Sequence, residues 1–373
     1  MKLCSIVLVT AAVAIAAPVA ELSAHDSTEQ SLEALRVAAM EEATLAFLAT
    51  LDETQRSVVM ASLDDNATRT GWSNLPVGLA PRSGMAVADM KTEQRLAMHA
   101  MMAAAMSSQG YLKTTTIMWH EDVLHEIFSA MIAGLPDDDP RKTEALAFKD
   151  NYDTEKFYVS VFGDPKGEDW GWTVTGHHFA ANFTVSEGKI AFTPLFVGAN
   201  PQIVPSGRYA GWRILQHEAD RAFALMTSLE QEQLAKAVVS DVVDDEIFAG
   251  KGQQDRIGVP VGIRASDLDP AQRRLLSGLI DEYLGDASDE AAARQRLAVE
   301  SDGNDALHMA WWGPTDDPAA RFMFRVQGPS IVIDYVRERT PDGGYNHVHS
   351  IVRDPSNDYG ADWLQRHYQE AHQ

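Results

Sequence analysis

The sequence predicts an α+β protein made of two copies of one unit, each a helix pair followed by antiparallel strands, related by pseudo-twofold symmetry. Three observations support this fold class: helix starts of similar sequence, a recurring spacing between them, and alternating hydrophobic residues after each pair. We expect a signal peptide over residues 1–24, a first repeat over residues 25–205 and a second over residues 206–373, packed as one compact unit.

The N-terminus has the pattern of a secretory signal. A single lysine precedes an apolar run over residues 3–17, and Ala16, Ala20 and Ala24 are candidate cleavage points. The run is shorter than the roughly 20 residues that a bilayer span needs. We therefore expect a periplasmic or secreted protein with no stable membrane insertion after cleavage. Cys4, the only cysteine, would leave with the signal, so the mature chain would have no disulfide.

Four segments have the pattern of a helix start. Asp52 and Asp269 are expected to cap two of these helices, with Gln55 and Gln272 three residues later as capping-box partners. Pro270 suits the first helical position. In each pair the second segment begins 39 residues after the first, which indicates a repeat. The segments are Leu51-DETQR, Met90-KTEQR, Leu229-EQEQL and Leu268-DPAQR.

About three strands are expected after each helix pair. Hydrophobic residues alternate, and the turn-forming stretches 186–189 and 341–344 indicate hairpins. The two units would pack sheet to sheet or share one antiparallel sheet with the helices outside. The second copy lacks a counterpart of residues 120–150, which would form two helices joined by a loop. The residues expected to share one strand face are Trp170, Trp172 and Val174 in the first copy, and Ile331, Ile333 and Tyr335 in the second.

Composition and motifs exclude several functions. Lys and Arg number 31 against 54 Asp and Glu, and the net charge of −23 would repel phosphate backbones, so we expect no nucleic-acid partner. The chain contains no G-x-S-x-G motif, no cysteine beyond the signal and no glycine-rich loop between a strand and a helix. Serine, thiol and phosphate-loop chemistry are therefore not supported.

Five segments together have the pattern of a known family. They are Arg82-SGMAVADMKTEQR, Trp170-GWTVTGHHFAANFTV, Phe196-VGANP, His347-VHSIVRD and Asn357-DYGADWLQRHY. On these segments the chain resembles a bacterial family known as domain of unknown function 3500, over nearly the whole mature chain. The resemblance implies an extracytoplasmic location, because members of the family usually carry a signal peptide, and it implies no activity.

Histidines from both repeats form the candidate site. His347 and His349, two residues apart on an expected strand, point to the same face. In the first repeat, His178 shares an expected strand face with Asn182, whereas His177 lies on the other face among aromatic residues. If the repeats pack about a twofold axis, these imidazoles can converge, and imidazole suits zinc, copper or iron. We therefore expect His178, His347 and His349 as metal ligands, with His177 as a further candidate.

Other residues complete the expected site. Glu218 is a candidate carboxylate ligand, and His308 can contribute as a ligand or, together with Asn182 and Trp172, bind a small molecule. Arg353 and Asp354 are candidate orienting or acid/base groups, although a structural ion pair between them is the alternative interpretation.

The leading hypothesis is an extracytoplasmic protein that binds a divalent transition metal, zinc, copper or iron. Such a site could activate water and hydrolyse a small or polymeric nutrient, but the sequence leaves open whether the protein is an enzyme. The first alternative is a non-catalytic protein that binds a small ligand in a cleft between the repeats. In the second alternative, the histidines only join the repeats structurally. None of these patterns indicates a substrate.

Overall fold

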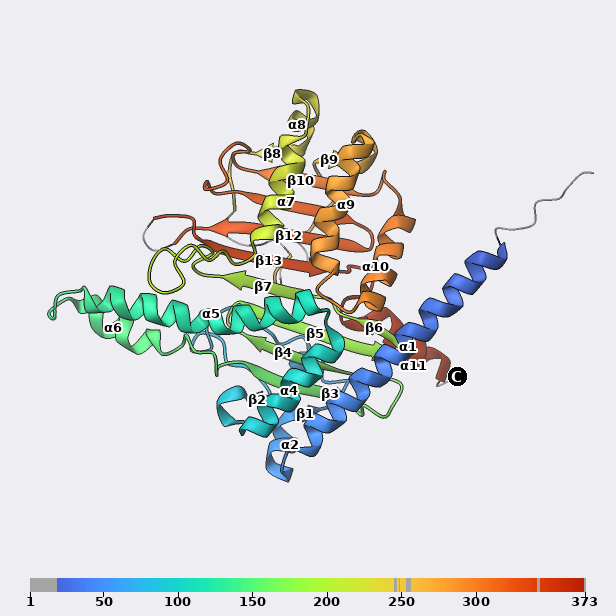
Figure 1. The fold of residues 1–373 in the computed structure, drawn as a ribbon, viewed down its shortest axis with the longest axis horizontal. Helices are drawn as coiled ribbons and strands as arrows, with labels where there is room; N and C mark the ends of the chain where they lie inside the picture. Colours follow the sequence, from blue (N-terminus) through green and yellow to red (C-terminus); the bar gives the residue numbers. More distant parts are fainter. Residues whose placement is uncertain (1–18, 245–246, 248, 253–255, 341–342, 372–373) are drawn as a thin grey trace, which may run out of the picture.

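The computed structural model describes residues 19–244, 247, 249–252, 256–340 and 343–371. Its helices alternate with groups of strands along the chain (Figure 1). The α-helices are α1 (Val19–Ala49), α2 (Glu53–Val59), α3 (Asn66–Arg69), α4 (Thr92–Ala105), α5 (Ser108–Ala133), α6 (Pro140–Lys149), α7 (Gln216–Thr227), α8 (Gln231–Ala237), α9 (Pro270–Leu284), α10 (Asp289–Asp302) and α11 (Ala361–Ala371). Short 3-10 helices are η1 (Val87–Asp89), η3 (Ala265–Asp267) and η4 (Asp358–Gly360).

The strands of the described residues form one 13-stranded sheet. Its order is β1-β3-β4-β5-β7-β13-β12-β11-β10-β8, with β2 beside β3, β6 beside β5 and β9 beside β10. Most pairs are antiparallel, but β1 with β3 and β8 with β10 are parallel, so the sheet is mixed. The strands are β1 (Met60–Ala61), β2 (Met85–Ala86), β3 (Tyr158–Gly163), β4 (Trp170–Gly176), β5 (Phe179–Ser186), β6 (Lys189–Ala191), β7 (Leu195–Ala199), β8 (Val238–Ser240), β9 (Ile263–Arg264), β10 (His308–Trp312), β11 (Met323–Gly328), β12 (Ile331–Glu338) and β13 (His347–Arg353).

The predicted α+β class is therefore confirmed, and of the two packing arrangements considered, the single shared sheet is the one observed. It is not purely antiparallel as predicted, because the short strands β1 and β8 follow their helices directly and add to the two edges in the parallel direction. Residues 120–150, predicted as two helices joined by a loop, form the C-terminal part of α5 and the whole of α6, and the far end of this helical hairpin projects from the body (Figure 1).

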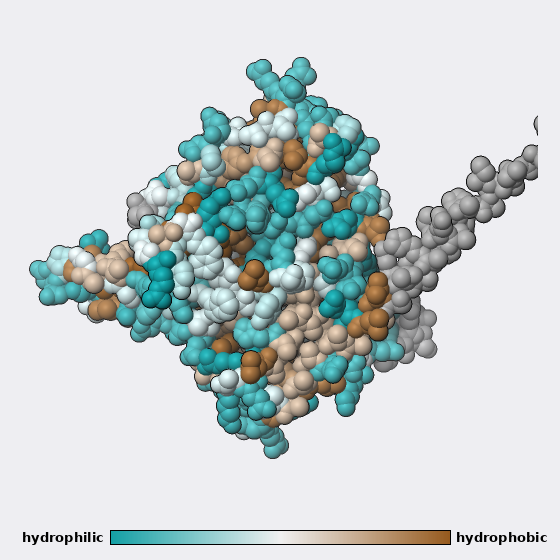
Figure 2. Space-filling view, in the orientation of Figure 1, coloured by the Kyte–Doolittle hydropathy of each residue, from teal (hydrophilic) through white to brown (hydrophobic). Residues whose placement is uncertain are grey.

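Both faces of the sheet are covered. Alternate strand residues such as Trp172, Phe183 and Ile333 pack against the helices in the larger core, as the predicted alternation requires. Residues of the opposite face, such as Phe196 and Val336, pack against loop residues in a second, smaller core. Figure 1 shows the helix side, where α7, α9 and α10 lie over one half of the sheet and α1, α4 and α5 over the other. Figure 2 shows that hydrophilic side chains dominate this surface, with hydrophobic ones in separate patches.

The predicted helix caps are present. The Asp52 carboxylate accepts from the Gln55 N–H at 2.9 Å, and Gln55 Oε1 accepts from the Asp52 N–H at 3.2 Å. Asp269 and Gln272 make the same reciprocal pair at 2.8 and 2.9 Å. These bonds satisfy N–H groups that a helix start leaves free, so local sequence fixes where α2 and α9 begin.

Most of the predicted signal peptide lies outside the described residues, which begin at Val19, so it stays a prediction. Within the described part of the chain, no helix is long and apolar enough to cross a membrane.

Candidate metal centre

The candidate site begins at the turn between β4 and β5. Only His177 and His178 separate the last residue of β4 from the first of β5, so they form a tight turn rather than the strand that we expected. His178 has φ +60°, which L-residues rarely adopt, and hydrogen bonds hold it there on both sides. Its N–H donates to the Asn74 carbonyl at 3.3 Å, and its carbonyl accepts from the Gly198 N–H at 2.7 Å.

The second part of the site lies on β13. His347 and His349 alternate along this strand and so share one sheet face, as predicted. The antiparallel register with β12 places Glu338 opposite His347 and next to His349. On its other side β13 pairs with β7, where Gly198 lies opposite His349. The pairing of β13 with β7 thus brings His347 and His349 next to the turn that carries His178, although these segments are far apart in the sequence.

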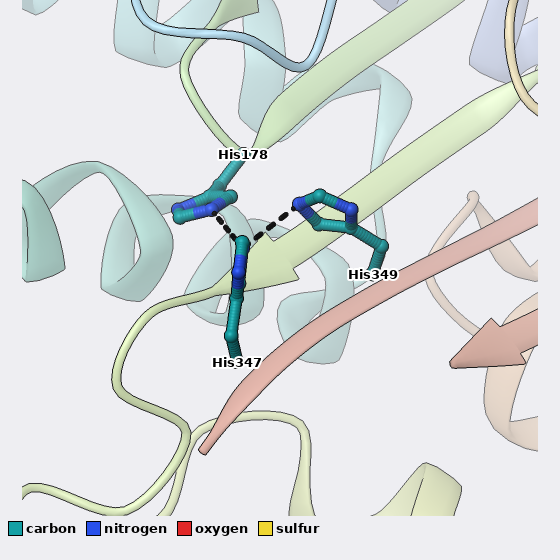
Figure 3. Close-up of side chains that lie close together, drawn as sticks. All are labelled: His178, His347 and His349. Carbon is teal, nitrogen blue, oxygen red and sulfur yellow. Dashed lines mark hydrogen bonds between the residues drawn. The ribbon is translucent and has the colours of Figure 1, made fainter. Parts of the chain in front are cut away.

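The three imidazoles point toward one another (Figure 3). His347 Nε2 lies 3.0 Å from His178 Nε2 and 3.0 Å from His349 Nε2. One nitrogen of each ring lies within 4.8 Å of the others. A tetrahedral ion with metal–nitrogen bonds of 2.0–2.1 Å separates its ligand nitrogens by about 3.3 Å, so an ion fits between the rings after small shifts.

Carboxylates face the other nitrogen of these rings. Glu338 Oε1 accepts a hydrogen bond from His349 Nδ1 at 2.7 Å, and its Oε2 lies 3.6 Å from His347 Nδ1. Glu121 Oε1, from α5, lies 3.4 Å from His178 Nδ1. An Nδ1–H directed at a carboxylate leaves the Nε2 lone pair free, which is the usual arrangement around histidines that bind a metal.

A second group of possible ligands, Glu121, His177 and His178, lies beside the first. Both carboxylate oxygens of Glu121 lie 2.8–2.9 Å from His177 Nδ1. However, the rings of His177 and His178 are stacked at 3.6 Å with an interplanar angle of 30°. Ligand lone pairs lie in the ring plane, so stacked rings direct theirs side by side rather than at one point. In this geometry Glu121 accepts a hydrogen bond from His177 and faces His178 Nδ1 at 3.4 Å, so its role is to orient these rings.

Burial favours the neutral forms of His178 and His347. It lowers the pKa of His178 well below its ordinary value, and the neighbouring His177 adds to the effect. Burial and the nearby His349 lower the pKa of His347 to about 3. Burial raises the pKa of Glu121. At Glu338 burial acts in the same direction, but His349, His347 and Arg321 together outweigh it and lower the pKa. Neutral imidazoles beside carboxylates are the form that binds a divalent cation without first losing a proton.

The backbone and aromatic residues around the triad leave little free space. A Cβ on Gly198 would lie 2.9 Å from His349 Cδ2 and 3.0 Å from His178 Cδ2, so only glycine lets both rings approach this strand. The Phe196 ring lies 5.3 Å from that of His349, and the Trp72 ring lies 5.5 Å from that of Phe196. The aromatic pair forms an apolar wall beside the imidazoles.

The structure does not bring Glu218 or His308 to this site. Glu218 lies on α7 and pairs with Lys113 Nζ at 2.7 Å, in a buried cluster with Glu282 and Asp286. His308 lies on β10, separated from β13 by two strands, and its Nδ1 is 3.2 Å from the Ala306 carbonyl. The sequence placed them near the site because it could not specify where each helix and strand lies across the sheet.

The other expected site residues have different surroundings. Trp172 is fully buried in the core on the helix side, and Asn182 donates to the Pro194 carbonyl at 2.7 Å. Arg353 shares the strand face of His349 but lies four residues farther along β13, about 13 Å at the usual rise. It pairs with Asp358 at 2.7 Å, not with its neighbour Asp354, which accepts from Gln295 at 3.1 Å. Both have structural partners away from the triad.

The sequence analysis missed three residues around the site. Glu121 orients His178, Glu338 orients His349, and His120 Nε2 donates to the Pro201 carbonyl at 2.7 Å, just after β7. A signal was present for Glu338, because the predicted hairpin between β12 and β13 places it opposite the first histidine. No sequence signal pointed to Glu121 or His120, the two residues on α5, because their contacts depend on how α5 lies across the sheet.

The protein is thus of the α+β class, with one sheet covered on both faces and a buried cluster of histidines and carboxylates. The chain belongs to the family described as Protein of unknown function (DUF3500), whose model matches residues 33–361. No curated protein sequence matches the chain significantly. No solved structure does so either.

Proposed function

We propose that the protein binds one divalent transition metal through His178, His347 and His349. The observation that carries the proposal is the arrangement of both nitrogens of each ring. The Nε2 atoms converge at about the spacing of metal ligands, while Nδ1 of each ring faces Glu121 or Glu338.

Charge balance supports the same proposal. Two carboxylates beside imidazoles that burial keeps neutral, His178 and His347, leave a local negative charge in a largely buried space, which is costly without a compensating cation. One divalent ion would compensate it. A network held only by hydrogen bonds needs one imidazole of each close nitrogen pair to donate from Nε2, and that would turn an Nδ1 lone pair toward a carboxylate. Cation binding therefore accounts better for the geometry.

Imidazole ligands suit zinc, copper or iron. Three protein ligands leave a coordination position for water or substrate, and an ion bound there would supply Lewis-acid chemistry. Metal-assisted hydrolysis is the reaction class that we propose if the protein is an enzyme. Glu338, part exposed at the rim, is the nearest carboxylate that is open to solvent, and it replaces Arg353 and Asp354 as the candidate acid/base group. We further propose a periplasmic or secreted location, from the signal-like residues 1–24.

We also propose that the chain arose by internal duplication, with the ligands divided between the halves. The strand order supports this, because β7 and β13 are central and similar series of strands extend outward from each. Two buried amides support it in detail. Gln94 Nε2 donates to Gln55 Oε1 at 2.7 Å, and Gln272 Nε2 donates to Gln233 Oε1 at 2.8 Å, each pair separated by 39 residues.

Elemental analysis of the purified protein after exchange into metal-free buffer tests the metal proposal. We expect about one equivalent of zinc, copper or iron in the wild type, and no retained metal in the double variant His347→Ala/His349→Ala. The variant His217→Ala is the matched control, because this exposed imidazole lies on α7 and, among the described residues, forms a hydrogen bond only with the neighbouring Gln216 side chain. It should retain the wild-type metal content.

The proposal would be refuted by a folded wild type that holds no metal after each of the three ions has been offered. Equal metal content in the wild type and a folded double variant would also refute it, since the ion would then lie elsewhere. Circular dichroism of all three proteins separates loss of the site from loss of the fold.

A further inference from the structure

A separate cavity is lined mainly by residues of α9 and α10. These two helices lie side by side on the same face of the sheet (Figure 1). The volume of this cavity is about 370 Å³, which is within the range of small-molecule sites. The inner wall is apolar and consists of Leu276, Ile280, Val299 and Leu307. These side chains are at most 8% exposed, so the surrounding helices hold them in place. The cavity is thus a preformed apolar recess of the size of a short hydrocarbon chain.

Arginines surround the apolar wall. Arg273, Arg274 and Arg296 line the cavity, against the acidic residues Asp281 and Glu300. Arg296 Nε donates to Asp281 Oδ1 at 2.7 Å, and the Arg273 guanidinium donates to the Leu268 carbonyl.

Arg274 differs from the other two arginines. It is exposed, and among the described residues it has neither a hydrogen bond nor an ion pair. A guanidinium without a partner, at the rim of an apolar recess, can form two parallel hydrogen bonds with a planar anion. The chain has a net charge of −23, so a small anion meets repulsion over most of the molecule and finds a local excess of positive charge here.

We propose that this cavity binds a small amphiphilic anion, with the carboxylate of a medium-chain fatty acid as the simplest example. The head group pairs with Arg274, and with the part of Arg296 not used by Asp281. The hydrocarbon chain lies along the wall formed by Leu276, Ile280 and Val299. The site shares no residue with the histidine triad, so the inference is independent of the proposed function.

Isothermal titration of the full-length protein with hexanoate, octanoate and 1-octanol tests the proposal. We expect one site for octanoate, binding about 15-fold tighter than hexanoate, because octanoate has two more methylenes and each buried methylene strengthens binding by about fourfold. The alcohol has the same number of carbon atoms as octanoate but no charge, so it should bind at least tenfold more weakly than octanoate if the arginines recognise the head group.

Variants separate the head-group contact from the apolar wall. Arg274→Gln should weaken octanoate binding about tenfold and leave octanol binding unchanged, whereas the exposed Ser277→Phe, which fills the cavity, should abolish binding of both. Arg366→Gln is the matched control, because this arginine is exposed on α11 and, within the part of the chain that the structure describes, pairs only with Asp362. This variant should bind octanoate as the wild type does.

The proposal is overturned if octanoate shows no saturable binding, or if Arg274→Gln and Ser277→Phe bind it as tightly as the wild type. Equal affinity for octanol and octanoate in the wild type would overturn the anionic class of ligand. The double variant His347→Ala/His349→Ala should bind octanoate normally if it folds. If it does not, Glu338→Gln provides the same check on independence from the triad.

Discussion

Gly198→Ala tests the triad without changing a ligand. The added Cβ would lie 2.9 Å from His349 Cδ2 and 3.0 Å from His178 Cδ2, against an optimal carbon–carbon separation of about 3.5–4.0 Å. Each ring must therefore move by about 0.5 Å or more, whereas metal–ligand bonds tolerate changes of about 0.2 Å. We expect metal affinity to fall about 10–100-fold and the unfolding free energy of the metal-free protein to fall by about 1–3 kcal/mol.

The assay is competition with a chromophoric chelator, together with urea unfolding of the metal-free protein. Gly278→Ala is the control, because a Cβ there meets only Arg221 Nη1 at 3.5 Å inside α9. This substitution should leave metal affinity unchanged and stabilise the helix by about 0.5–1 kcal/mol. Wild-type affinity and stability in Gly198→Ala would refute the argument that this glycine allows the two rings to converge.

Three further changes test the surroundings of the site. Glu338→Gln should lower metal affinity about 10–100-fold in the chelator assay, because the amide orients the imidazoles less strongly than the carboxylate. His120→Gln should keep a donor for the Pro201 carbonyl but remove a group that titrates. Burial lowers the pKa of His120 to about 4. Its neutral form therefore contributes stability that is complete above about pH 6.5 and is lost as the pH falls toward 4. From pH 7 to pH 5 the wild type should therefore lose about 2 kcal/mol more unfolding free energy than the variant in urea titrations. Asp334→Ala should cost about 3–5 kcal/mol, because Asp334 is fully buried and pairs with Arg325 at 2.6 and 2.7 Å.

Each of these predictions has a control. Glu300→Gln, which changes an exposed carboxylate, should leave metal affinity unchanged. Above about pH 8, where His120 is neutral in both the folded and the unfolded state, the wild type and His120→Gln should show the same pH dependence of stability. The double variant Arg325→Met/Asp334→Leu should recover most of the stability lost in Asp334→Ala, since no charge is then left buried and unpaired. Wild-type metal affinity in Glu338→Gln would contradict the orienting role of this carboxylate. Wild-type pH dependence of stability in His120→Gln would contradict the lowered pKa of His120. A small loss of unfolding free energy in Asp334→Ala would contradict the cost of an unpaired buried charge.

The sequence predicted the features that local patterns determine. Capping boxes at Asp52 and Asp269 follow from short-range hydrogen bonding, and the shared face of His347 and His349 follows from the two-residue period of a strand. These patterns do not depend on the rest of the chain.

The remaining features depend on tertiary packing. Glu218 was expected among the ligands but pairs with Lys113, because the position of α7 over the sheet is not encoded locally. His178 was expected on a strand, but it lies in a tight turn at positive φ, where the Asn74 carbonyl and the Gly198 N–H hold it. Glu121 reaches the site only because α5 crosses the sheet, and no sequence spacing links it to either pair of histidines.

X-ray absorption at the metal edge of the loaded protein is the most direct test of the proposed triad. The account predicts three imidazole ligands at about 2.0–2.1 Å, with the multiple-scattering signature of intact rings, and loss of that signature in His347→Ala/His349→Ala. A spectrum with oxygen ligands only, or an unchanged imidazole signal in the folded double variant, would contradict it.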